Sequence, residues 1–220
     1  MTVRRVAFIH TVGFLVETFR TRMRDALPDV DCFHILNESL LQDLLRGEAR
    51  TAVYRRVVDQ VLAAADAGAD LIVTTCSSTS PAVDLARPLL DQPVLKIDDP
   101  MMAAAVRTGR RIGLVCTATS TIEPSSALLR SHAEAQGRDV SVTPLLRADA
   151  YAALLAGDRA AHDRMIRDAV AGAAGIVDVI VLAQASLAHL ADELAASAPI
   201  PVIASPPLLM EALAARCAAT

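Results

Sequence analysis

The chain repeats part of its own sequence, and the repeat differs at one reactive position. Residues 70–78 (DLIVTTCSS) return as residues 178–186 (DVIVLAQAS), an offset of 108 positions. Residues 5–11 (RVAFIHT) return as residues 111–117 (RIGLVCT), an offset of 106. Internal similarity of this kind indicates that one structural unit is built twice. The sequence therefore predicts two similar units, with Cys76 in the first at the position that Gln184 holds in the second.

The spacing of apolar residues predicts an α/β fold with parallel sheets. Alanine-rich amphipathic segments, such as 54–67 and 160–174, predict helices between short β-branched runs. These runs predict strands at 6–9, 31–35, 71–74, 94–97, 112–116, 140–144, 179–182 and 202–204. Alternation of strands and helices is typical of βαβ units. We expect two pseudo-symmetric lobes, each a short parallel sheet flanked by helices, with an active-site cleft between them.

The repeat also predicts where the two lobes begin and end. The first lobe is expected to comprise residues 1–98 with 207–220 and to carry Cys76. The second is expected to comprise residues 99–206 and to carry Gln184.

Composition and charge exclude several classes of function. The 220 residues carry a net charge of −4 without a block of like charges, which argues against nucleic acid and against an anionic membrane surface as partners. Aromatic residues make up only 3%, which does not suit a base-stacking platform. The most apolar stretch, 169–191, is interrupted by Asp178 and Gln184, and charge in mid-span is costly in lipid. We expect no nucleic-acid partner and no membrane partner.

The cysteines indicate the compartment and argue against a metal. Four cysteines are widely scattered and contain no CxxC pair, so neither a disulfide framework nor a zinc site is expected. The first residues show no apolar signal region. We expect a cytoplasmic protein without a metal or another cofactor, and the alanine- and leucine-rich helices favour a homo-oligomer, by default a dimer.

Small polar residues gather at the predicted ends of four strands, where ligands bind in open parallel sheets. Hydroxyl groups and helix N-termini bind carboxylates well, although serine and threonine also cap helices. Both interpretations stay open for each cluster, and their corresponding places in the repeat favour a shared carboxylate site. The candidate substrate-binding residues are His10, Thr11, Thr75, Ser77, Ser78, Thr117, Thr119, Ala185 and Ser186.

Cys76 and Gln184 are the candidate catalytic residues, and for Gln184 a role in binding alone stays open. Cys76 lies at a predicted turn from strand to helix, where the positive end of the helix dipole favours a thiolate. A thiolate there can abstract a proton next to a carboxylate or add to an unsaturated carbon. The other three cysteines are interpreted as small buried apolar side chains. His10 is either a helper of Cys76 and the substrate or a structural histidine, and His162 is a further candidate for the cleft.

With these residues in place, the chain resembles the aspartate/glutamate/hydantoin racemase superfamily, which includes maleate isomerase and arylmalonate decarboxylase. The motifs that carry the resemblance are FIHT at 8–11, TCSS at 75–78, KIDDPM at 96–101, RIG at 111–113 with TAT at 117–119, and the strand end 181–186. The resemblance implies catalysis in an inter-lobe cleft without metal or organic cofactor. In such racemases two cysteines face each other across the substrate's α-carbon. Cys76 matches the first, and Gln184 occupies the position of the second.

This departure excludes the symmetric two-thiol mechanism, because an amide neither ionises near neutral pH nor usefully accepts a proton. Three hypotheses remain: an isomerase in which Cys76 acts alone on a small carboxylate or dicarboxylate, a carbon–carbon lyase on the same scaffold, and a small-acid-binding protein with reduced chemistry. By resemblance, Ser77, Ser78 and Thr119 would stabilise the substrate carboxylate, and Gln184 would hold a carboxylate or carbonyl. The scarcity of aromatic residues favours a small polar acid over an aryl-substituted one.

Overall fold

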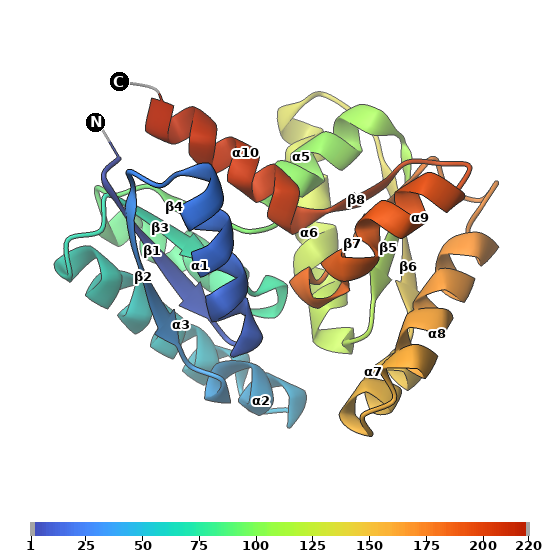
Figure 1. The fold of residues 1–220 in the computed structure, drawn as a ribbon, viewed down its shortest axis with the longest axis horizontal. Coiled ribbons are helices and arrows are strands. Elements are labelled where there is room, and N and C mark those ends of the chain that lie inside the picture. Colours follow the sequence, from blue (N-terminus) through green and yellow to red (C-terminus); the bar gives the residue numbers. More distant parts are fainter. Residues whose placement is uncertain (1–2, 219–220) are drawn as a thin grey trace. The chain divides into compact units, whose positions relative to one another are not determined.

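The computed structural model describes residues 3–218, and within them the chain forms two compact α/β units (Figure 1). The first unit comprises the chain up to Ile97 together with the segment from Pro207 onward. The second unit is Asp98–Pro206. Each unit contains one four-stranded sheet in which all strands are parallel. The predicted fold class, two similar units built on short parallel sheets flanked by helices, is confirmed.

The sheet of the first unit has the strand order β2-β1-β3-β4. Its strands are β1 (Arg5–His10), β2 (Asp31–Leu36), β3 (Leu71–Thr74) and β4 (Val94–Lys96). The helices along this half of the chain are α1 (Phe14–Ala26), α2 (Ser39–Leu45), α3 (Arg50–Asp66), η1 (Ser77–Thr79), α4 (Pro81–Ala86) and η2 (Arg87–Leu89). The unit also holds α10 (Ser205–Ala218) from Pro207 onward, although this helix follows the last strand of the second unit.

The sheet of the second unit has the equivalent order, β6-β5-β7-β8. Its strands are β5 (Arg111–Cys116), β6 (Ser141–Leu146), β7 (Val179–Leu182) and β8 (Val202–Ala204). The helices are α5 (Asp99–Thr108), α6 (Thr119–Ala135), α7 (Ala148–Leu155), α8 (Arg159–Gly172), η3 (Ala185–Leu190) and α9 (Ala191–Ser197). Helix α5 follows β4 of the first unit, so the two units exchange the helix that comes after their fourth strand.

Apolar faces of both sheets are covered by helices, as a buried parallel sheet requires. In the first unit, β1, β3 and β4 present Ala7, Ile9, Ile72 and Val94 to a core shared with α2, α3 and α4. The other face carries Phe8, which stacks on Phe19 of α1 with ring centroids 5.2 Å apart. The second unit repeats the first arrangement with α7, α8 and α9 (Figure 1).

Matching hydrogen bonds show that the repeat is structural as well as sequential. The Asp70 carboxylate accepts from the backbone N–H groups of Arg4 and Arg5, at 2.8 and 2.9 Å. The Asp178 carboxylate accepts from those of Arg110 and Arg111, at 3.0 and 2.8 Å. Each aspartate thereby ties together the first residues of the two central strands of its sheet, β1 with β3 or β5 with β7. The polar candidate residues lie at the opposite ends of these strands.

No helix among residues 3–218 is both long enough and apolar enough to cross a membrane.

Candidate active site

The candidate residues of the first unit lie where β1 and β3 leave the sheet. The two strands are paired neighbours, with Ile9 opposite Thr74, so His10 and Thr75 emerge side by side. Cys76 follows with extended backbone angles, φ −125° and ψ 115°, and immediately precedes η1. Cys76 is only half-buried, whereas Thr75, Ser77 and Ser78 around it are buried. The cysteine therefore stands partly exposed on a short turn between β3 and η1.

A directed chain of hydrogen bonds begins at Thr75. The Thr75 Oγ1 lies 3.1 Å from the Ile9 carbonyl and 2.8 Å from His10 Nδ1. The hydroxyl has one proton and the carbonyl can only accept it, so His10 Nδ1 donates to Thr75. The bare Nε2 of His10 then accepts from His34 Nδ1 at 2.9 Å. His34 Nε2 in turn faces the Cys32 thiol at 4.0 Å.

The pKa values agree with this neutral chain. Burial, with His34 as a second cause, lowers the pKa of His10 to about 3. Burial also lowers the pKa of His34, helped by Arg20, and raises the pKa of the Cys32 thiol. Both ring nitrogens of His10 are engaged and the residue is fully buried. Of its two predicted roles, the structure favours the structural one: His10 positions Thr75 beside Cys76.

This burial gives the fold a pH dependence that measurement can check. The folded-state pKa of His10 lies far below the 6.5 of an unfolded histidine, so between pH 6.5 and 3 the unfolded chain binds more protons. Stability is then lost as the pH falls through this window, by at most about 1.4 kcal/mol per pH unit for one proton. We expect the free energy of unfolding, measured with urea at each pH, to fall less steeply between pH 6.5 and 4 in the His10→Gln variant than in the wild type. The same pH dependence in both proteins would contradict a neutral His10–His34 pair.

Thr11 differs from Thr75 in that its hydroxyl has no hydrogen-bond partner in the part of the chain that the structure describes. Its Oγ1 is buried, and no hydrogen-bond partner for it exists within residues 3–218. An unpaired buried hydroxyl is costly, so such a group points to a water or ligand partner. Thr11 is thus the first-unit hydroxyl best suited to meet a bound carboxylate.

The equivalent edge of the second unit is organised by Gln184. Its backbone angles, φ −136° and ψ 133°, place it before η3 much as Cys76 stands before η1. The Oε1 of Gln184 accepts from both the backbone N–H and the hydroxyl of Thr117, at 2.5 and 3.0 Å. A backbone N–H can only donate, so the amide orientation is assigned: the carbonyl oxygen faces Thr117 and the NH₂ group faces away.

The remaining predicted residues of this edge are less closely engaged. Thr119 is exposed at the start of α6, Ala185 offers no polar side-chain atom, and the Ser186 carbonyl accepts from His189 Nδ1 at 2.9 Å. Cys116 corresponds to His10 in the repeat, is fully buried, and has its pKa raised to about 11 by that burial. It is an inert core residue, as its sequence context indicated.

Three participants in these networks were not predicted from the sequence, namely His34, Cys32 and His189. The alternation of Phe8 with His10 and of Cys32 with His34 was the available signal, because residues two apart share one face of a strand. The register that pairs Phe8 with His34 is needed to bring the two histidines together.

The chain is thus an α/β protein built from two similar units, each with polar groups at the carboxyl ends of its strands. A thiol stands at one strand end of the first unit, and an amide stands at the equivalent strand end of the second. The profile of the Asp/Glu/Hydantoin racemase family matches residues 14–213, and the chain belongs to this family. The resemblance stated from the motifs is thereby confirmed. A search of curated protein sequences found no match.

Solved structures show the same fold. Allantoin racemase from Klebsiella pneumoniae is similar with a TM-score of 0.69 and 21% identity, over 96% of this chain and 87% of that one. A glutamate racemase from Bacillus anthracis gives 0.74 and 15%, over 97% and 80% of the two chains. A glycine-to-cysteine variant of arylmalonate decarboxylase, in a sulfate-associated form, gives 0.62 and 17%, over 98% and 94%. The fold is thus shared by racemases and by a decarboxylase.

Proposed function

We propose that the protein is a cofactor-independent isomerase that acts on a small carboxylic acid at the carbon next to its carboxylate, with Cys76 as the reactive group. The observation that carries this proposal is the placement of Cys76. It stands partly exposed at the end of β3, immediately before η1 and beside the buried hydroxyl residues Thr75 and Ser77. Cys116, by contrast, is sealed in the core, where burial raises its pKa to about 11. Cys32 and Cys217 are partly buried as well, and burial raises the pKa of each of these two thiols.

Gln184 has the complementary role of holding the substrate. Because Thr117 occupies its carbonyl oxygen, the NH₂ group is the end of the side chain offered to a ligand. That group donates hydrogen bonds to a carboxylate or carbonyl oxygen and neither gives nor takes a proton near neutral pH. We propose that Gln184 and Cys76 act on the same substrate, and that the buried hydroxyl of Thr11 is a further ligand of its carboxylate.

Two one-sided reactions suit this arrangement. In the first, the thiolate removes the α-proton, the electron pair moves into the carboxylate as an enediolate, and the resulting thiol returns a proton to the carbon after the planar intermediate has turned its opposite face toward the sulfur. In the second, the thiolate adds to a C=C bond conjugated with the carboxylate, the resulting single bond rotates, and the C–S bond breaks to restore the alkene and the thiolate. Neither step consumes an external reagent.

A decarboxylase is the second candidate, supported by the structural similarity to arylmalonate decarboxylase and by the presence of one site thiol. There a C–C bond breaks, CO₂ leaves with the electron pair remaining on carbon, and the thiol protonates that carbon. Carbon dioxide release from a malonate panel identifies this reaction. Deuterium that enters the recovered substrate from D₂O, without release of CO₂, identifies α-proton exchange instead.

Alkylation of the native protein tests the proposal before a substrate is known. At pH 7, iodoacetamide should modify Cys76 about tenfold faster than free cysteine, because a thiolate and not a thiol reacts. A small dicarboxylate such as maleate should slow this reaction. Cys116 provides the internal control and should stay unmodified in the same digest. Modification of Cys76 no faster than free cysteine would contradict the enzymatic proposals and favour a binding protein.

A further inference from the structure

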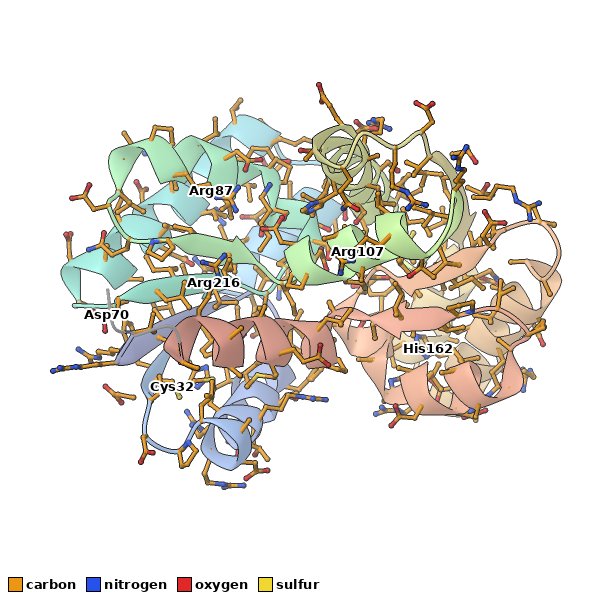
Figure 2. All side chains as sticks on the ribbon, turned by 90° about the horizontal axis from the view of Figure 1, so that it is seen from above. Cys32, Asp70, Arg87, Arg107, His162 and Arg216 are labelled. Carbon is orange, nitrogen blue, oxygen red and sulfur yellow. The ribbon has the colours of Figure 1, made fainter. Side chains whose placement is uncertain are left out.

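A cluster of two histidines and an aspartate lies in the second unit, on residues that the proposed reaction does not use. His162 and Asp163 occupy the first turns of α8, where Figure 2 marks His162, and His189 belongs to η3. His162 Nδ1 lies 2.7 Å from Asp163 Oδ1, and His189 Nε2 lies 2.9 Å from the same oxygen. One ligand atom from each residue falls within 4.8 Å of the other two.

His189 is held between two oxygen atoms. Its Nδ1 meets the Ser186 carbonyl and its Nε2 meets the Asp163 carboxylate. His162 Nδ1 meets the same carboxylate oxygen, so two imidazole nitrogens and one carboxylate oxygen converge at one place.

We propose that His162 Nδ1, Asp163 Oδ1 and His189 Nε2 form a site for a divalent transition-metal ion of the zinc class. Imidazole nitrogen with carboxylate oxygen is a donor set that Zn²⁺ prefers, and three protein ligands leave a fourth position for water. A tetrahedral site with bonds of about 2.0–2.1 Å needs donor atoms about 3.3 Å apart. The two contacts to Asp163 Oδ1, at 2.7 and 2.9 Å, must therefore each lengthen by about half an ångström, and the two histidine nitrogens, which lie within 4.8 Å of each other, must take up the same spacing.

The surroundings of the cluster support this assignment. The Ser186 carbonyl accepts from His189 Nδ1, which leaves Nε2, the nitrogen beside Asp163, as the ligand atom for a metal. The positive charge of Arg167 also acts near Asp163, and the Glu193 carboxylate pairs with that guanidinium. The His162 side chain is buried, whereas that of His189 is partly exposed, so a metal ion can reach the cluster from the His189 side.

A metal here would join α8 to η3, the segment that begins directly after Gln184. The inference is independent of the chemistry proposed for Cys76. It also departs from the expectation of a metal-free protein, which considered cysteine spacing and not side chains that the fold brings together.

Titration of the chelator-treated full chain with Zn²⁺ at pH 7.5 tests the site. The wild type should bind one equivalent, and His189→Ala and Asp163→Asn should each weaken binding roughly tenfold to hundredfold. The matched control is His132→Ala, which removes the two-residue contact of His132 with Asp99 in the same unit and should leave zinc affinity unchanged. His189 is partly exposed, so its variant is the one expected to fold normally.

Co²⁺ provides a second readout, because tetrahedral coordination should produce visible absorption in the wild type that is lost in His189→Ala. Absence of stoichiometric Zn²⁺ binding by the wild type would overturn the proposal and leave a cluster held by hydrogen bonds alone. Equal affinity in wild type and His189→Ala would overturn it as well.

Discussion

Replacing Cys76 with serine is expected to lower kcat by about a thousandfold or more, which corresponds to about 4 kcal/mol of lost transition-state stabilisation. A serine hydroxyl has almost the same size and fits the same turn before η1, but it is not ionised near neutral pH. The loss should therefore appear in kcat, with substrate binding largely retained. Steady-state kinetics on the substrate found by the deuterium and carbon dioxide screens provide the measurement.

Cys116→Ser is the matched control for this experiment. Cys116 stands at the end of β5, is fully buried, and has a pKa of about 11, so it takes no part in the reaction. We expect its kcat to match that of the wild type, with some loss of stability from the buried hydroxyl. If Cys76→Ser kept more than a tenth of wild-type kcat, a thiol-dependent reaction would be ruled out.

Replacing Gln184 with cysteine is expected to raise racemase activity well above that of the wild type. The variant places a second thiol at the strand end equivalent to Cys76. On the proposal that both positions act on one substrate, one sulfur then removes an α-proton and the other delivers one. Proton transfer by a positioned group contributes about a hundredfold or more to rate. We therefore expect racemisation of aspartate, glutamate or a hydantoin, measured by deuterium uptake at the α-carbon, to rise at least about tenfold above wild type.

The double variant Cys76→Ser/Gln184→Cys separates a two-thiol mechanism from a new one-thiol reaction. It retains the introduced sulfur and removes its partner, so the gained racemisation should disappear. Persistence of the activity in the double variant would show that the two positions do not serve the same substrate carbon.

Much of the fold could be predicted because the repeat and the β-branched runs are strong local signals. The runs at 71–74, 179–182 and 202–204 coincide with β3, β7 and β8. Helix α3 begins at Arg50, four residues before the predicted start at residue 54. The prediction began late because residues 50–52 are exposed and add nothing to the apolar periodicity on which it relied. Local sequence thus identified elements better than it identified their polar ends.

The strand ends that carry the candidate residues could be predicted from the sequence, but the hydrogen bonds among their side chains could not. That Cys76 and Gln184 end equivalent strands follows from the repeat, whereas the orientation of the Gln184 amide depends on the backbone N–H of Thr117, 67 positions away. The His10–His34 contact likewise depends on strand register, which alternation alone does not set. The His162–Asp163–His189 cluster needs α8 and η3 to meet, and no local pattern encodes that.

A crystal structure of the Cys76→Ser variant with a bound small dicarboxylate would examine the proposed reaction geometry most directly. We predict that the hydroxyl oxygen introduced by this substitution, standing in for the sulfur, lies within about 3.5 Å of the substrate carbon next to a carboxylate. The Gln184 NH₂ group should donate to a carboxylate oxygen of the same molecule. A dicarboxylate bound away from residue 76, or bound there with Gln184 making no contact to it, would contradict the mechanism.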